Sequence, residues 1–136
     1  MGFFDLFATK QNSDKKYVTE EAYKKNKENQ LNMTPKTLKQ LRDLGVTESK
    51  ELKLEYFFYT NSVDKAKKLA DEIQKENYKV EYGKSAGDKK LFVITGWTTK
   101  MIMSDTVVID WTNKMCDLGY EFDCDFDGWG TEPDQE

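Results

Sequence analysis

The chain has 136 residues, of which 38% are hydrophobic, and it carries a formal net charge of −4. This length and composition are sufficient for one domain with a modest hydrophobic core. The sequence contains no histidine, which excludes the commonest general base near neutral pH, the Ser–His and Cys–His nucleophilic pairs and the commonest zinc ligand. We therefore expect no enzyme activity, no catalytic residues, no metal site and no cofactor.

The first ten residues, MGFFDLFATK, have neither the positive start nor the long apolar run of a signal peptide. No segment approaches the length of apolar sequence that spans a membrane. The two cysteines, Cys116 and Cys124, provide no disulfide framework and are expected to be free thiols in a reducing compartment. These features predict a cytoplasmic protein without a membrane partner. The phenylalanines at the start could contact a partner or pack on their own domain.

Residues 8–33 are rich in Lys, Asn, Glu and Gln and can bury little apolar surface. We interpret residues 1–33 as a polar leader, with a marginal helix over residues 20–29 at most. The pattern changes at Thr34, which can cap a helix, and at Pro35, which suits the first helical position. A short amphipathic helix over residues 35–44 is predicted, ended by Gly45, and the folded domain is expected to span residues 34–136.

Alternating and helical patterns follow one another along the rest of the chain. Asn61 or Ser62 can cap the first of the remaining helices, Ser104 caps the second, and Gly119 is expected to end it. The predicted elements are a strand over residues 52–59, a helix over 63–76, strands over 78–82 and 91–95, a helix over 105–118 and a strand over 120–127. This β-α-β-β-α-β order predicts a ferredoxin-like α+β sandwich, in which two helices cover one face of a four-stranded antiparallel sheet, with an added N-terminal helix.

The segment DCDFDGWGTEPD, residues 123–134, begins like an EF-hand calcium loop. However, Gly119 is expected to end the preceding helix, Pro133 falls inside the loop, and too little sequence follows for a second helix. On the predicted strand, Asp123, Asp125 and Asp127 instead share one face, opposite an apolar stripe. Calcium binding is therefore a less favoured alternative.

Direct RNA binding is a second less favoured alternative. A four-stranded sheet with exposed aromatic side chains is the platform of the RNA-recognition motif. The third predicted strand, KKLFVITG, lacks the alternation of glycine and aromatic residues of that motif. The last 22 residues contain eight acidic residues and no basic residue, so they repel phosphate. We expect no direct nucleic-acid partner.

Trp129 stands between two glycines just after the last predicted strand. Its indole could fold back and cover the end of the sheet, or it could stand out and anchor a protein partner. An acidic strand next to a tryptophan would suit a basic partner segment. The partner-binding candidates are Asp123, Asp125, Asp127, Gly128, Trp129 and Gly130.

With this order of elements and the ending FDGWGTEP, the sequence resembles the family of the regulator of ribonuclease E activity B. The motif residues are Asp127, Gly128, Trp129 and Gly130, and YEFDCDF stands where that family has its final strand. The resemblance extends over about residues 38–133. The polar leader is additional to the family's domain, and the acidic ending is shorter than the acidic extension of the enterobacterial members.

The resemblance implies a small bacterial cytoplasmic protein that binds an endoribonuclease and restrains its activity without catalysing a reaction. It also implies an α+β sandwich. The alternative function is that of a general cytoplasmic protein-interaction domain with a different target. The sequence leaves the oligomeric state open.

Overall fold

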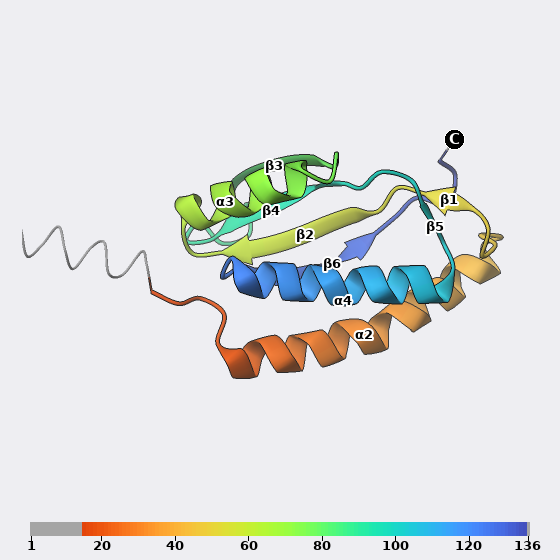
Figure 1. The fold of residues 1–136 in the computed structure, drawn as a ribbon, viewed down its shortest axis with the longest axis horizontal. Helices are drawn as coiled ribbons and strands as arrows, with labels where there is room; N and C mark the ends of the chain where they lie inside the picture. The colour runs from red at the N-terminus through yellow and green to blue at the C-terminus, as the bar shows by residue number, and fades with distance from the viewer. Residues whose placement is uncertain (1–14, 136) are drawn as a thin grey trace, which may run out of the picture.

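The computed structural model describes residues 15–135. Six elements form its main body: β2 Glu55–Thr60, α3 Val63–Gln74, β3 Lys79–Lys84, β4 Phe92–Trp97, α4 Asp105–Glu121 and β6 Asp125–Gly130. The strands form an antiparallel sheet in the order β3-β4-β2-β6, and α3 and α4 cover one face of it (Figure 1). The predicted ferredoxin-like α+β fold is confirmed, with the first and third strands of the motif at the centre of the sheet.

The hydrophobic core lies between the sheet and these two helices. Along β2, Tyr56 and Phe58 are fully buried, whereas Phe57 and Tyr59 are only partly buried, as the period of two in a strand requires. Leu69 of α3 and Val108 of α4 are buried on the helix side. Burying each of these larger apolar side chains contributes about 1.5–3 kcal/mol to folding.

The strand predicted over residues 52–59 is divided into two. Its beginning forms β1, Glu51–Leu52, which pairs with β5, Met101–Ile102, in a separate two-stranded sheet. Between β1 and β2, the N–H of Leu54 donates to the Thr98 hydroxyl at 2.9 Å, and the Leu54 carbonyl accepts from the Thr98 N–H at 2.8 Å. Because a side-chain oxygen takes the place of a backbone carbonyl here, the regular ladder stops at this point.

The predicted helix over residues 35–44 is part of a longer helix, α2, which spans Glu20–Asp43. Its N-cap is Thr19, whose side chain accepts from the N–H of Ala22, so the predicted cap at Thr34 is wrong. Pro35 lies inside the helix and cannot donate to the carbonyl of Leu31. Packing compensates for the missing hydrogen bond, because Thr34 and Leu38, on either side of Pro35, are buried against the rest of the protein.

Residues 20–33 therefore do not form the polar tether that was expected. The Tyr23 ring in the first half of α2 stacks on the Tyr120 ring of α4, with centroids 4.2 Å apart. The Lys27 ammonium pairs with Asp117 of α4 at 2.8 Å. The division of the chain at residue 34 stays a prediction, and it falls in the middle of a continuous helix. The phenylalanines of the first ten residues lie outside the described part.

The last helix also continues beyond its predicted end, since α4 runs through Gly119 to Glu121. A Cβ at Gly119 would lie 2.7 Å from the carbonyl oxygen of Cys124 and 3.0 Å from the Phe58 ring, so this glycine permits close packing inside the helix. The helix ends at Glu121 with Phe122 as its C-cap, and the next residue, Asp123, has a left-handed backbone with φ of 57°. The N–H of Cys124 then donates to the Gly119 carbonyl at 2.8 Å, as in a Schellman motif.

Within residues 15–135, no helix has the length and apolar composition needed to cross a membrane.

Candidate functional site

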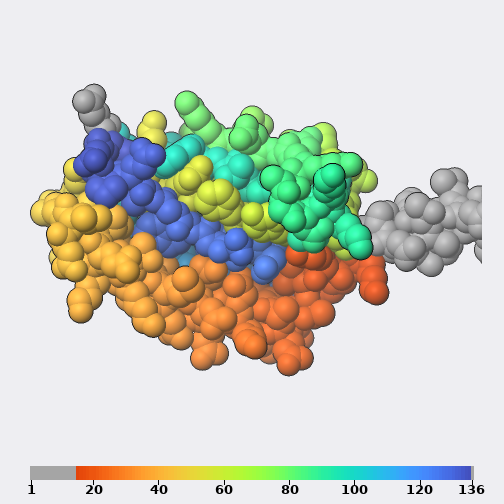
Figure 2. All heavy atoms as spheres, turned by 180° about the vertical axis from the view of Figure 1, so that it is seen from behind, coloured from red at the N-terminus to blue at the C-terminus, as the bar shows by residue number. Residues whose placement is uncertain are grey.

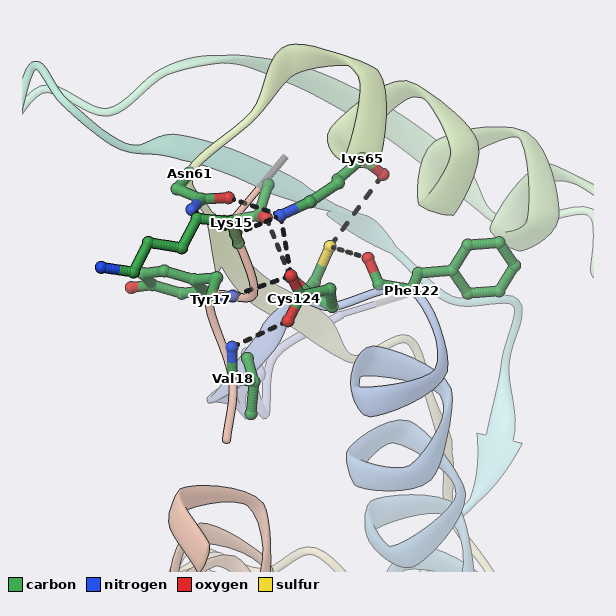
Figure 3. A network of polar contacts seen from close by, with 9 residues as sticks. Lys15, Tyr17, Val18, Asn61, Lys65, Phe122 and Cys124 are labelled. Carbon is green, nitrogen blue, oxygen red and sulfur yellow. Dashed lines mark hydrogen bonds and ion pairs between the residues drawn. The ribbon is translucent and has the colours of Figure 1, made fainter. Parts of the chain in front are cut away.

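Asp123 lies in the turn between α4 and β6, not on the strand where it was expected. Its carboxylate accepts hydrogen bonds from the N–H groups of Tyr17 and Val18, both at 2.8 Å. The Lys65 ammonium of α3 pairs with the same carboxylate at 2.7 Å (Figure 3). Both side chains of this ion pair are 17% exposed. Asp123 thus uses both carboxylate oxygens inside the protein.

Three further hydrogen bonds complete the network around Asp123. Lys65 also donates to the Lys15 carbonyl at 2.8 Å and to the Asn61 side chain at 2.9 Å (Figure 3). The Thr60 hydroxyl donates to the Asp123 carbonyl at 2.9 Å. Burial opposes ionisation of Asp123, but the bonds from Lys65, Val18 and Tyr17 outweigh it and lower the pKa of the carboxyl group. The network holds the segment before α2 against α3 and the α4–β6 turn.

A β-bulge in β6 changes the direction in which Trp129 points. Phe58 of β2 lies opposite Phe126, but the preceding residue, Phe57, lies opposite Gly128, so Asp127 is an additional residue on β6. Gly128 has a φ of 129°, which favours glycine. After the bulge, Trp129 lies opposite the buried Tyr56 and is on the core side. Of the two positions expected for Trp129, the structure thus has the one in which the indole folds back on the domain.

Trp129 packs against the helices and is partly buried. Its ring meets the Trp111 ring of α4 edge to face, with centroids 6.4 Å apart. Its indole N–H donates to the Thr34 hydroxyl of α2 at 3.0 Å. The Thr34 hydroxyl lies 3.0 Å from the Thr112 hydroxyl, which donates to the Val108 carbonyl at 2.8 Å. Trp129 thereby joins β6 to both α2 and α4.

Asp125 and Asp127 remain at the surface of β6. Asp125 is partly buried and accepts from the Asn26 amide at 3.2 Å, while the same amide donates to the Phe126 carbonyl at 2.8 Å. Burial raises the pKa of Asp125, and the charge of Asp127 raises it further. Asp127 is exposed. These two acids therefore form a smaller acidic edge than the stripe of three that was expected.

The acidic edge borders the outer sheet face, which is the face turned away from α3 and α4. In the register of the sheet, Asp125 lies opposite Tyr59. Figure 2 shows this face with α2 (orange) along one side, next to β6 (blue). The partly exposed residues on the two central strands of this face are Glu55, Phe57, Tyr59, Val93, Thr95 and Trp97.

The segment that began like an EF-hand loop has a different structure. Asp123 is in a turn, Asp125 and Asp127 are in a strand, and the segment after Gly130 is not helical as far as Gln135. Among residues 15–135, no three or more acidic or cysteine side chains lie close enough together to hold a metal ion. The geometry of an EF-hand is therefore absent from this part of the chain.

Cys116 and Cys124 are both buried and free, which confirms the prediction of free thiols. Burial raises the pKa of each thiol to about 12. Neither thiol has the thiolate character of a reactive cysteine at neutral pH.

The family model described as regulator of ribonuclease activity B matches residues 31–131. The chain belongs to this family. The matched region begins in α2 and ends just after β6, so it includes the whole ferredoxin-like sheet, the bulge and Trp129. The resemblance drawn from the motif Asp127–Gly130 is therefore confirmed. A search of curated proteins finds no match to the chain.

Proposed function

We propose that this chain regulates an endoribonuclease of the bacterial cytoplasm by binding it, without catalysing a reaction itself. The observation that carries the proposal is the match to the regulators of ribonuclease activity over residues 31–131. The absence of histidine from the whole sequence gives further support, because it removes the usual acid–base and nucleophilic machinery of RNA cleavage.

The acidic edge and the adjoining outer sheet face are the proposed contact surface. Asp125 and Asp127 can attract a basic partner segment, while Phe57 and Tyr59 offer aromatic area next to them. Open space surrounds the position where a side chain at Gly130 would lie, so a partner backbone can approach closely there. Gly128 is part of the same surface, where its role is to permit the bulge.

Asp123 and Trp129 have a different proposed role. Both are candidates from the sequence, but their polar atoms are engaged by Lys65 and by Thr34 inside the protein. We propose that they hold the contact surface in place, so their substitution should weaken regulation through loss of folding.

The test is a cleavage assay with an endoribonuclease purified from the same organism and a fluorogenic RNA substrate. We expect the folded protein to change the cleavage rate in a saturable manner and to co-elute with the enzyme in gel filtration. Asp125→Asn/Asp127→Asn should weaken the effect, most clearly at low salt, because exposed charges act mainly on association. Asp43→Asn/Glu132→Asn is the matched control, since both residues are exposed acids outside the surface.

A labelled copy of the RNA substrate, incubated with the protein alone, excludes sequestration of the substrate. Binding of this RNA at the concentrations that change cleavage would contradict the proposed mechanism. A folded protein that neither binds the enzyme nor changes its rate, even in large excess, would contradict the proposed function.

A further inference from the structure

A groove lies on the side of the sheet that carries the helices, between α4 and the end of α3. Its volume is about 600 Å³. Tyr78, which directly precedes β3, and Met101 of β5 complete its walls. Its apolar lining consists of the buried side chains Ile73, Trp111 and Met115 and the more exposed side chains Met101, Val107 and Leu118. Figure 1 shows α3 and α4 on this face with β2 visible between them, and α4 extends well beyond α3.

The helix α4 has more apolar side chains than the sheet can cover. Val108 and Met115 are buried against the core, but Val107 is 40% exposed and Leu118 is only partly buried. Val107, Trp111 and Leu118 are spaced by four and seven residues, so they follow one stripe along the helix on the groove side. Trp111 is only 8% exposed, so the apolar surface that a partner would complete consists mainly of Val107 and Leu118.

Acidic side chains surround this apolar stripe. Glu76, Asp110, Asp117 and Glu121 line the groove, and Lys114 is the one basic residue among its lining residues. Asp110 pairs with Lys114 at 3.3 Å, and Asp117 pairs with Lys27 of α2. No ion pair within residues 15–135 involves Glu76 or Glu121. These two exposed acids are therefore available to a basic ligand.

We infer that the groove binds a basic amphipathic helix of the protein partner. The inference rests on the proposed function, since it assumes a protein partner, and it specifies a second contact surface. Apolar side chains of the partner helix would lie on Val107 and Leu118, next to the exposed edge of Trp111. Its Lys or Arg side chains would meet Glu76 and Glu121. Charge complementarity thus selects a basic partner over an acidic one.

The length of the groove agrees with a helical partner segment. It follows α4 from Val107 to Glu121, which corresponds to about 21 Å along a helix axis and therefore to a partner helix of about 14 residues. A polar contact can fix the position of this helix. The Tyr78 hydroxyl accepts from the indole N–H of Trp111 at 3.2 Å, and its own hydrogen can donate to a partner carbonyl at the helix end.

The probes are three labelled synthetic peptides of about 14 residues, tested with the full chain. The first is a Leu/Lys amphipathic helix, the second has Glu in place of each Lys, and the third is a scrambled Leu/Lys sequence. Fluorescence anisotropy gives the affinities, and amide chemical shifts in NMR spectra locate the binding site. We expect saturable binding of the first peptide only, with shifts confined to the groove residues.

Two matched pairs of variants separate the groove from general acidity. Glu76→Lys/Glu121→Lys should raise the Kd of the Leu/Lys peptide about tenfold at low salt, whereas Asp43→Lys/Glu132→Lys, with the same change in net charge, should change it less than about twofold. Val107→Asn should weaken binding through the lost apolar contact. Leu44→Asn, at a side chain that is 68% exposed outside the groove, should have no effect.

Several outcomes would overturn this inference. They are equal binding of the Leu/Lys and scrambled peptides, shifts outside the groove, and equal effects of the two charge-reversal pairs. Concentration-dependent shifts of the groove residues without any peptide would mean that a second copy of the chain occupies the groove, which would also overturn it.

The ribonuclease assay distinguishes failure of this inference from failure of the proposed function. If Glu76→Lys/Glu121→Lys leaves regulation of the ribonuclease unchanged, the groove is not its contact and the inference fails, while the proposed function stands. If the Leu/Lys peptide binds in the groove but the protein does not affect the ribonuclease, the groove site stands and the proposed target fails.

Discussion

Replacing Asp123 by Asn should destabilise the protein strongly although it changes only one atom of the side chain. The carboxylate of Asp123 accepts two backbone N–H bonds and the Lys65 ammonium, all between 2.7 and 2.8 Å. An amide has one acceptor oxygen and one donor group, so it must leave at least one of these donors unpaired. Asn tolerates the left-handed backbone at this position, so the substitution isolates the hydrogen bonds from backbone strain.

The expected loss follows from the burial of this network. Hydrogen bonds to charged groups contribute about 1.5–3 kcal/mol each, and a buried unpaired donor costs about 1–3 kcal/mol. Since part of the carboxylate network survives in the amide, we expect Asp123→Asn to lower the free energy of unfolding by about 2–4 kcal/mol. For a chain of this length, the melting temperature should fall by roughly 6–20 °C.

The pH dependence supplies an internal control for Asp123. Its pKa is lowered in the folded state from the ordinary value of 3.8, so its contribution to stability is present above that value and is lost as the pH falls through the folded pKa. The difference in unfolding free energy between wild type and Asp123→Asn should therefore shrink between about pH 5 and pH 2. Urea denaturation followed by circular dichroism at several pH values measures it. A difference below about 0.5 kcal/mol at pH 7, or one that does not depend on pH, would refute this account.

The remaining predictions concern the same framework. Trp129→Phe keeps an aromatic ring but loses the bond to the α2 hydroxyl, so it should cost about 1–2 kcal/mol in urea denaturation, and no loss would contradict the structural role of the indole N–H. Asp125→Asn should keep or raise the melting temperature at pH 7, because burial raises the pKa of this carboxyl group and its ionised form therefore destabilises the folded state; a drop of several degrees would contradict this. Cys116 and Cys124 should resist alkylation in the native protein and react after unfolding, as a mass measurement would show. A fragment of residues 34–136 should melt well below the full chain, since it lacks the first half of α2, and equal stability would favour a domain boundary at residue 34.

The fold was predictable from the sequence because its central elements have clear periodicity. The alternation of Tyr56 and Phe58 with Phe57 and Tyr59 indicated the central strand and its buried face. The two helices that cover the sheet begin close to their predicted caps, Ser62 and Ser104. Local patterns of this kind determine the order β-α-β-β-α-β, and that order is compatible with few sheet topologies.

Long-range contacts explain the errors at the element ends. Pro35 and Gly119 are usually signals for the boundary of a helix, but both lie inside helices here. Thr34, next to the proline, is buried on Thr112, and the glycine permits close approach of the Cys124 carbonyl. Tertiary packing thus overrides local propensity at these positions.

The geometry of the candidate site could be predicted only in part, because a bulge leaves no distinctive pattern in a single sequence. In a regular strand, a period of two would place Asp125, Asp127 and Trp129 on one face. One additional residue moves every later side chain to the opposite face of the sheet. The glycine at 128 was the available signal, since glycine inside a strand often marks a bulge. The carboxylate of Asp123 gave no such signal, because its partners, Tyr17 and Lys65, are far away in the sequence.

The position of α2 restricts how a partner can bind this protein. The outermost strand β6 lies at one edge of the sheet, where the Asn26 amide of α2 already bonds to the Phe126 carbonyl. The other edge strand, β3, carries the exposed charges of Lys79, Glu81 and Lys84, which disfavour the addition of a further strand. Because neither edge is suited to extending the sheet, the proposed protein contacts would use side chains on a face. This restriction favours the outer sheet face and the groove along α4 over backbone pairing as the means of regulation.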